Sequence, residues 1–435
     1  MFKKILPLNL ILFLRFFGLF LVLPLISLYA YNLEGATPLL VGIVIGGYAL
    51  TQAVFQVPFG VLSDKFGRKK LIIFGLTLFL VGSLISFTAT DIWTLIIGRL
   101  LQGAGAIGSV ISATVSDLVQ EEKRGKAMAI VGGSIAMSFA LAMVIGSTVG
   151  AIYGVDILFL ITAILSIISI FIAFKIPEIG KIEFKFRKGG VKHNLFKDRT
   201  LLYLFFSSLL QKGIMSIIFM IIPIVLTTQN GWEMADLWKV YIPAMFVGLL
   251  AMGPAVVFGE KKNKPKVVFI LSSALFIVVS ALISFGESDT IILALFIFFV
   301  AFNLIEPLIQ SMVSKFVKAD EKGKALGFTN SFAYVGTFLG GTGAGLFLDG
   351  GNIQMLGYIL LTLSTIWFIW TITISNPIPK GNIYLNFSTN MEKKLEKGNF
   401  EFIDEWYINR TEKLIVIKYD KSKFTEDDLK AKLKR

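Results

Sequence analysis

Four ionisable side chains lie deep inside long apolar runs of this 435-residue sequence: Arg15, Arg99, Lys212 and Glu306. An ionisable residue at mid-helix costs about 2.5 kcal/mol or more on membrane-insertion scales, so such residues usually belong to a functional site. Glu306 is the only carboxylate deep in any of these runs. Because burial disfavours its charged form and a nearby cation favours it, this residue is suited to binding and releasing a proton.

We therefore predict that Glu306 carries a coupled proton and that Lys212 or Arg15 modulates it. The alternative is a fixed Glu306–Lys212 pair that only holds two helices together. Three deep cations against one deep anion favour an anionic, zwitterionic or neutral ligand over a cationic one. The polar and aromatic residues expected to line the cavity are Tyr48, Gln52, Gln56, Gln102, Asn303, Gln310, Phe332 and Tyr334.

A second charged group lies in GVLSDKFGRKK, residues 60–70, a short connection between two apolar runs. An aspartate at a membrane boundary needs a cation or a helix N-terminus to offset its desolvation, as Asp64 does here. Gly60 would let another helix approach closely, and Gly67 permits the turn that returns Arg68 toward the bundle. The three lysines of the stretch are expected only to set orientation in the membrane: Lys65, Lys69 and Lys70.

Other kinds of chemistry have little support in the sequence. The chain has no Cys and a single His, His193, which excludes a disulfide framework, a thiolate metal site and a cysteine nucleophile. We identify no nucleophile–base set and no nucleotide-binding loop, so we expect no enzyme, no metal and no cofactor. The net charge is +13, but it is concentrated in short loops between apolar runs, so we predict no nucleic-acid partner.

The elements that must position these residues are membrane helices. Hydrophobic residues make up 55% of the chain and charged residues 16%, and apolar runs of 18 or more residues recur along it. Twelve spans are predicted, at about 5–30, 38–59, 71–89, 92–116, 126–150, 156–176, 200–227, 236–258, 267–286, 290–313, 324–348 and 352–375. Basic and acidic loops alternate between them, which predicts cytoplasmic termini.

An internal repeat divides the spans into two halves. VSDLVQEEKRGKA at 115–127 aligns without gaps to VSKFVKADEKGKA at 313–325, and two parallel six-helix repeats are a known transporter plan. After the spans, segments 382–387, 400–406 and 414–420 resemble strands, whereas 390–398 and 426–435 resemble helices. We predict an all-α membrane bundle with a small α+β ferredoxin-like domain. The expected boundaries are 1–176 and 200–375 for the halves, 177–199 for the linker and 381–435 for the small domain.

The signature G-x-x-x-D-[RK]-x-G-R-[RK] of the major facilitator superfamily resembles this sequence at Gly60, Asp64, Lys65, Gly67, Arg68 and Lys69. GRLLQGAGA, which contains Arg99, is similar to the family's R-x-x-Q-G-x-G-A motif on the fourth helix, and the likeness extends over all twelve spans. Together with FFVAFNLIEP and the short C-terminal domain, these motifs look most similar to the YajR-like drug-efflux members, which carry a ferredoxin-like tail.

The resemblance implies roles for the matching residues. Asp64 would face the start of the eleventh span near Gly323, and Arg68 would pair with Asp117, with Arg124 nearby. This gate cluster would lock the cytoplasmic side in the outward-open state and break when the halves move. Arg99 would take part in proton coupling; the alternative is a purely structural pairing. Lys315 and Val257 stand where the second half would repeat Asp117 and Asp64, so the gate is expected to be built mostly from the first half.

The function predicted from these observations is proton-coupled secondary transport of a small amphiphilic compound by alternating access, as an efflux antiporter. Gly146 is followed by Ser147 where the family's antiporter motif has proline, which weakens the inference of antiport. A proton-coupled or facilitative metabolite importer is the alternative, and a membrane sensor that signals through residues 381–435 is another. The expected partners are the substrate, protons and the lipid bilayer, for a monomer in a bacterial inner membrane.

Overall fold

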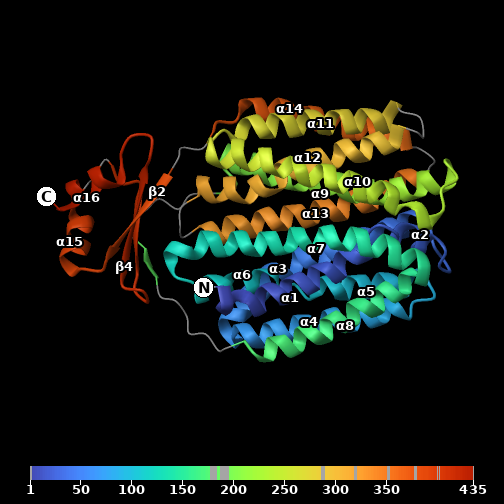
Figure 1. The fold of residues 1–435 in the computed structure, drawn as a ribbon, viewed down its shortest axis with the longest axis horizontal. Helices are drawn as coiled ribbons and strands as arrows, with labels where there is room; N and C mark the ends of the chain where they lie inside the picture. The colour runs from blue at the N-terminus through green and yellow to red at the C-terminus, as the bar shows by residue number, and fades with distance from the viewer. Residues whose placement is uncertain are drawn as a thin grey trace.

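A computed structural model of the chain describes residues 2–176, 184–186, 195–285, 290–317, 321–349, 353–376, 380–398, 400 and 402–434. Figure 1 shows a long helical bundle with a small α+β domain at one end, next to the N-terminus. The first half contains α1 (Phe2–Leu21), α2 (Ile26–Tyr31), α3 (Pro38–Phe66), α4 (Arg68–Phe87), α5 (Ile92–Ala104), α6 (Gly108–Leu118), α7 (Arg124–Tyr153) and α8 (Val155–Phe174). The second contains α9 (Arg199–Thr228), α10 (Trp238–Val256), α11 (Pro265–Phe285), α12 (Thr290–Phe316), α13 (Lys322–Asp349) and α14 (Ile353–Thr373).

Eleven helical stretches in the described part of the chain are long and apolar enough to cross a membrane. The first predicted span differs from the others because it is broken. Its apolar helix Ile5–Leu21 is shorter, and a turn at residues 22–25 separates α1 from α2. Pro24 explains the break, since proline has no N–H and restricts the residue before it.

The fourth span is also broken, between α5 and α6, within GRLLQGAGA. A methyl group at Gly103 would overlap the carbonyl of Tyr48 on α3, and one at Gly105 would overlap the carbonyl of Gly75 on α4. These glycines let three helix backbones approach closely around Arg99. In the second half α10 continues as a π-helix, Val257–Lys261.

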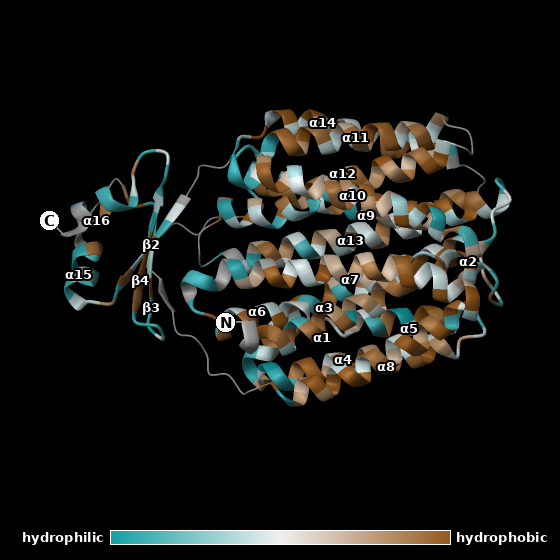
Figure 2. Cartoon of the chain, in the orientation of Figure 1, coloured by the Kyte–Doolittle hydropathy of each residue, from teal (hydrophilic) through white to brown (hydrophobic). Residues whose placement is uncertain are grey.

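The apolar surface of the helices follows the expected membrane pattern. Figure 2 shows hydrophobic residues over most of each long helix, and hydrophilic residues concentrated at the helix ends and in the small domain. We call the end with the Asp64 loop and the small domain the basic end. The opposite end, which carries Glu34, Asp91 and Asp156, is the acidic end.

The two halves pack tightly against each other at the acidic end, through α3 and α13. A methyl group at Gly42 would overlap the carbonyl of Gly341, and one at Gly345 would overlap the carbonyl of Pro38. One buried apolar cluster joins acidic-end residues of the first half to most of the second half. At the basic end, first-half residues form a separate buried cluster. The close backbone contact between the halves that these glycines mark therefore lies at the acidic end.

Replacing Gly42 with alanine tests this contact. The added methyl group must push α13 away, and overpacking of this kind costs about 1–3 kcal/mol. We expect a lower unfolding temperature for the purified protein. The matched control is Gly343, which lies on the part of α13 that faces α3. A methyl group at Gly343 would meet no atom within 4 Å. An equal loss of stability in both variants would contradict the tight contact.

The small domain is built from β2 (Lys380–Asn386), α15 (Thr389–Lys397), β3 (Glu405–Asn409), β4 (Leu414–Asp420) and α16 (Glu426–Lys434). This is the predicted β-α-β-β-α order, although the predicted strand at 400–406 was placed too early. Its core contains Ile383, Leu395, Trp406 and Leu429, so both helices cover one apolar face of the sheet.

A fourth strand, β1 (Phe184–Phe186), comes from the linker between the halves and was not predicted. The strand order is β1-β3-β4-β2, and β1 pairs antiparallel to β3, with Lys185 opposite Ile408. Pairing along the chain's own linker covers the edge of β3, which would otherwise be open. Because linker and small domain share one sheet, they lie on the same side of the bundle, as an even number of spans between them requires.

Candidate functional site

The Arg68 cluster lies at the basic end of the first half. The Arg68 guanidinium contacts Asp64 Oδ1 at 2.9 Å and Asp117 Oδ2 at 3.2 Å, and it donates a hydrogen bond to Ser63 Oγ at 2.8 Å. Gly67 adopts a φ of 99°, a conformation that favours glycine and returns Arg68 toward α6. The structure thus brings together the Asp64, Arg68 and Asp117 of the prediction and adds Ser63. The side chain of Arg124 lies outside the part of the chain that the structure describes.

One expectation about this cluster is corrected, and two others stay predictions. Gly60 does not mark a close approach, since a methyl group there would meet its nearest atom, Ser109 Oγ, at 3.9 Å. Asp64 is 57% exposed and pairs with Arg68, while a methyl group at Gly323 would meet no atom within 4 Å. The cluster was expected to break when the basic end opens. Its contacts are formed here, and all of its members belong to the first half.

One of the three loop lysines makes a contact that the sequence did not indicate. Lys69 donates a hydrogen bond from Nζ to the carbonyl of Phe174 at 2.6 Å, at the C-terminal end of α8. A cation at a helix C-terminus interacts favourably with the unpaired carbonyls there. Lys69 therefore holds the α3–α4 connection to α8.

The second half has a corresponding ion pair in which the charges are reversed. Lys315 on α12, which aligns with Asp117, contacts Glu260 of the π-helical turn at 2.9 Å. The sequence alignment placed Val257 opposite Asp64 and missed Glu260, which lies one turn later. Each half thus carries a charged contact between its second connection and its fourth span at the basic end.

A polar chain crosses between the two halves near the middle of the bundle. Arg15 on α1 donates a hydrogen bond from Nη2 to Gln52 Oε1 at 3.4 Å, and Gln52 donates from Nε2 to the Tyr334 hydroxyl on α13 at 2.7 Å. Arg15 is fully buried and its guanidinium lies over the rings of Phe16 and Phe79. The three predicted residues meet across the boundary between the halves.

Arg99 continues this polar region within the first half. Its guanidinium lies 4.6 Å from the centre of the Tyr48 ring, and it donates to the carbonyl of Val44 at 3.2 Å and to Gln102 Oε1 at 2.8 Å. Gln102 donates in turn to Ser83 Oγ at 2.9 Å. Arg99 therefore ties α3, α4 and α5 together, which gives it a structural role as well as a charge.

In the second half Lys212 on α9 contacts Glu306 on α12 at 2.9 Å. The Lys212 ammonium also lies 4.5 Å from the centre of the Phe302 ring. The Glu306 side chain is 38% exposed, so the carboxylate is more open to solvent than its place within an apolar run suggested. Gly213, next to Lys212, packs against Gly336 of α13, two residues after Tyr334, so the Glu306–Lys212 pair lies near the polar chain.

The remaining predicted cavity residues make hydrogen bonds or packing contacts outside the polar chain, and their place in a cavity stays a prediction. Asn303 donates to the carbonyl of Phe299 in its own helix and packs against Gly248 on α10, so its observed contacts are with its own helix and α10. Gln310 donates to Asn330 Oδ1 at 2.8 Å, and Gln56 is buried. Gln211, beside Lys212, was missed; it is buried and donates to the carbonyl of Phe302.

Several donors of this region have no protein partner in the described part of the chain. They are Nε and Nη1 of Arg15 and Nη2 of Arg99. Each unpaired buried donor costs about 1–3 kcal/mol, more when the group is charged. Two buried guanidinium groups with spare N–H donors can bind an acceptor that carries negative charge.

The fold and the position of the Arg68 cluster can be compared with known proteins. The family model of the Major Facilitator Superfamily matches residues 8–341 and 244–385. The chain belongs to this superfamily. It is a multi-pass membrane transporter of that superfamily and not an enzyme. A methyl group at Gly146 on α7 would overlap the carbonyl of Leu21 on α1, so this glycine permits close packing of the two helices.

Individual members of the superfamily differ in their sequence identity to this chain. The inner membrane transport protein YajR of Escherichia coli K12 is 34% identical over 420 residues, which cover 94% of this chain and 92% of that protein. Multidrug resistance protein 2 of Bacillus subtilis is 24% identical over 380 residues, covering 82% and 92%. The crystal structure of a D-xylose–proton symporter matches with a TM-score of 0.70 at 12% identity, covering 86% of this chain and 99% of that one. That likeness shows the fold.

Proposed function

We propose that this transporter moves a small amphiphilic compound out of the cell in exchange for protons. The observation that supports it most is the polar chain Arg15–Gln52–Tyr334, which joins the halves beside the Glu306–Lys212 pair. A motion that separates the halves at this level must break the Gln52–Tyr334 hydrogen bond. Access to the site is thereby linked to the charge state of groups next to it.

Proton coupling is assigned to Glu306. Its carboxylate is partly exposed and held by Lys212 at 2.9 Å, so protonation would remove that ion pair and release Lys212. Gly213, next to Lys212, packs against Gly336 of α13, so release of Lys212 would act near the contact between the halves. Arg99, bound to the backbone of α3, positions α3 in the same region.

The substrate is proposed to carry an anionic group. Arg15 and Arg99 keep donors without a protein partner in the described part of the chain, and a substrate carboxylate or phosphate would satisfy them. The aromatic rings of Phe16, Tyr48 and Phe79 near the two guanidinium groups would contact the apolar part of an amphiphile.

The orientation of the protein in the membrane is assigned from the charge of its loops. We place the basic end and both termini in the cytoplasm because basic loops lie on that side. The relative YajR is an inner membrane protein, and we assign the same membrane to this chain, as a monomer.

The proposal is tested by reconstituting the purified protein in vesicles with an imposed pH gradient and screening amphiphilic anions, zwitterions and cations. Accumulation of the substrate in vesicles whose lumen is more acidic than the medium supports exchange of the substrate for protons. Counterflow without any response to the pH gradient would instead favour the facilitative importer. Transport of cations alone would contradict the assignment of an anionic group.

Arg15→Gln tests substrate binding directly. Loss of the guanidinium removes the charged donors, so we expect the apparent KM for a transported anion to rise at least about tenfold, the loss of one charge-assisted hydrogen bond. Lys239→Ala removes a cation that pairs with Asp236 at the acidic end and should leave the KM unchanged. An unchanged KM in the Arg15 variant would contradict the role of Arg15.

A further inference from the structure

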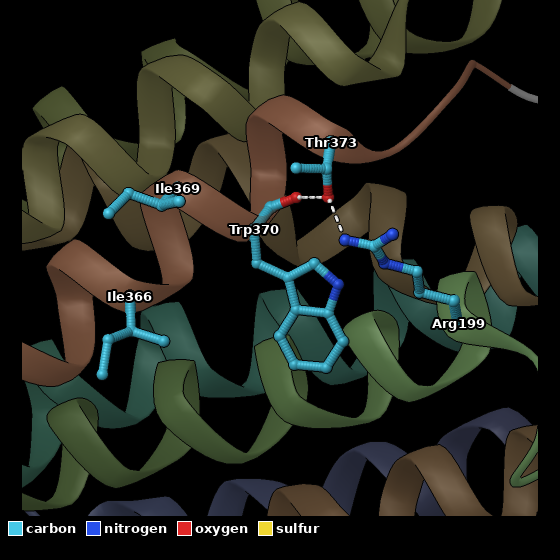
Figure 3. A pocket seen from close by; sticks show the side chains of 5 residues that line it. All are labelled: Arg199, Ile366, Ile369, Trp370 and Thr373. Carbon is cyan, nitrogen blue, oxygen red and sulfur yellow. Dashed lines mark hydrogen bonds between the residues drawn. The ribbon is translucent and has the colours of Figure 1, made fainter.

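A groove lies at the basic end between the start of α9 and the end of α14, away from the polar chain. Its cavity volume is about 330 Å³, and it is lined by Arg199, Ile366, Ile369, Trp370 and Thr373. Figure 3 shows Arg199 reaching from α9 toward α14, while the other four residues come from α14 itself. Nothing in the transport cycle described above uses these residues.

One wall of the groove is apolar and faces outward. Ile366 and Ile369 are 48% and 57% exposed, and with Trp370 and Thr373 they follow the spacing of one helix face. Exposed isoleucines on a membrane span contact lipid, because no other apolar medium surrounds the bundle. The groove therefore opens into the bilayer rather than into the centre of the protein.

The other side of the groove is polar and positively charged. The Arg199 side chain donates from Nη2 to Thr373 Oγ1 at 3.3 Å, a contact that uses one of its five N–H donors. Trp370 Nε1 is buried and has no partner in the described part of the chain. In Figure 3 the nitrogen edge of the indole lies on the side of the Arg199 guanidinium. Two kinds of N–H donor thus face the same small space.

Helix stability does not account for the cation at this place. Arg199 is the first residue of α9, where a positive charge opposes the helix dipole. The preceding Asp198 already accepts hydrogen bonds from the N–H groups of Thr200 and Leu201 at 2.8 and 3.0 Å. The carboxylate is therefore engaged with the backbone, and the spare donors of Arg199 suit an external anion.

We propose that this groove binds one anionic phospholipid, with its phosphate at Arg199 and Trp370 and an acyl chain along Ile366 and Ile369. A charged guanidinium gives charge-assisted hydrogen bonds to phosphate oxygens, and an indole N–H at the membrane interface commonly contacts the polar part of a lipid. Basic pockets between membrane helices are known to hold lipid head groups. The apolar wall selects a lipid over free phosphate, which would leave that wall bare.

The bound lipid would also bridge α9 and α14, two helices of the second half whose ends join the linker and the small domain. Arg199 and Thr373 already contact each other across this junction. A phosphate that accepts from Arg199 and Trp370 adds a second bridge. The lipid is thus expected to stabilise the second half where both connections leave it.

The test is native mass spectrometry of the full-length protein in detergent, titrated separately with phosphatidylglycerol, phosphatidylethanolamine and inorganic phosphate. We expect the first phosphatidylglycerol to bind about tenfold more tightly than phosphatidylethanolamine. Arg199→Gln should lower phosphatidylglycerol affinity about tenfold and Trp370→Phe about threefold, in line with loss of a charged and a neutral donor. Arg199→Lys should retain part of the affinity. Lys65→Ala is the matched control, since it removes an exposed cation from the same end of the first half.

Unfolding temperatures of the lipid-free variants identify any variant that fails to fold, and Trp370→Phe keeps the aromatic ring in place. Equal phosphatidylglycerol affinity in wild type and in both groove variants would overturn the proposal. So would equal affinity for phosphatidylethanolamine, because the site would then not select a net anionic head group. Arg199-dependent binding of inorganic phosphate without Arg199-dependent binding of lipid would overturn it in favour of a free-phosphate site.

Discussion

Asp117→Asn is expected to lower transport at least about tenfold. The Arg68 guanidinium contacts the Asp117 carboxylate at 3.2 Å in a partly buried site, and a hydrogen bond to a charged group contributes about 1.5–3 kcal/mol. Asparagine keeps the shape of the side chain but removes the charge, so Arg68 loses its more buried anionic partner. Asp64→Asn should act in the same direction. The measurement is the initial rate of transport in vesicles, normalised to the amount of folded protein.

Lys262→Ala is the control for this prediction. Lys262 lies at the same end of the second half, and its ammonium is 4.5 Å from the centre of the Phe258 ring, an exposed contact worth about 0.5–1 kcal/mol. Its loss should be tolerated. Equal effects at Asp64, Asp117 and Lys262 would show that charge at the basic end matters only in a general way and that the Arg68 cluster has no special role.

Glu306→Gln is expected to abolish transport driven by a pH gradient while leaving exchange of substrate across the membrane in place. Glutamine can still accept a hydrogen bond from Lys212, but it cannot take up or release a proton. The chain offers a close control in Glu260→Gln. Glu260 also pairs with a lysine at 2.9 Å and has a similarly exposed side chain, 35% against 38%, but it lies at the basic end.

The two variants separate a proton carrier from a fixed ion pair. If Glu306 only holds α9 to α12, then Glu306→Gln and Glu260→Gln should both reduce stability a little and leave the response to pH unchanged. Retained coupling in Glu306→Gln would therefore contradict the proton role. If Glu260→Gln also lost coupling to the pH gradient, the loss would be a general effect of removing a carboxylate and would not identify Glu306 as the proton carrier.

The sequence predicted the spans well because membrane helices are long, apolar and local. It predicted the contact between Arg68 and Asp117 through a family motif whose turn depends on Gly67. The second-half pair was missed because the alignment counts residues, whereas the π-helix Val257–Lys261 changes the number of residues per turn. Glu260 contacts Lys315, whereas the alignment puts Lys261 opposite Arg68, the partner of Asp117.

The polar chain between the halves could be predicted only as a set of candidates. Gln52 and Tyr334 are 282 residues apart, and no local pattern shows which polar side chains meet across a boundary between two domains. Asn303 illustrates the difficulty, since an amide within a membrane span serves equally well to pack one helix against another. The contact with Phe299 and Gly248 depends on the depth of the α10–α12 packing.

The linker strand has a consequence for the order in which the protein is made. β1 is synthesised more than 200 residues before its partner β3, which at about 5–20 residues per second is a delay of roughly 10–45 s. During that time the six helices α9–α14 must enter the membrane. The sheet can be completed only if an even number of them has crossed, because otherwise β1 and β3 would lie on opposite sides. Closure of the small domain is therefore a late step that depends on correct insertion of the whole second half.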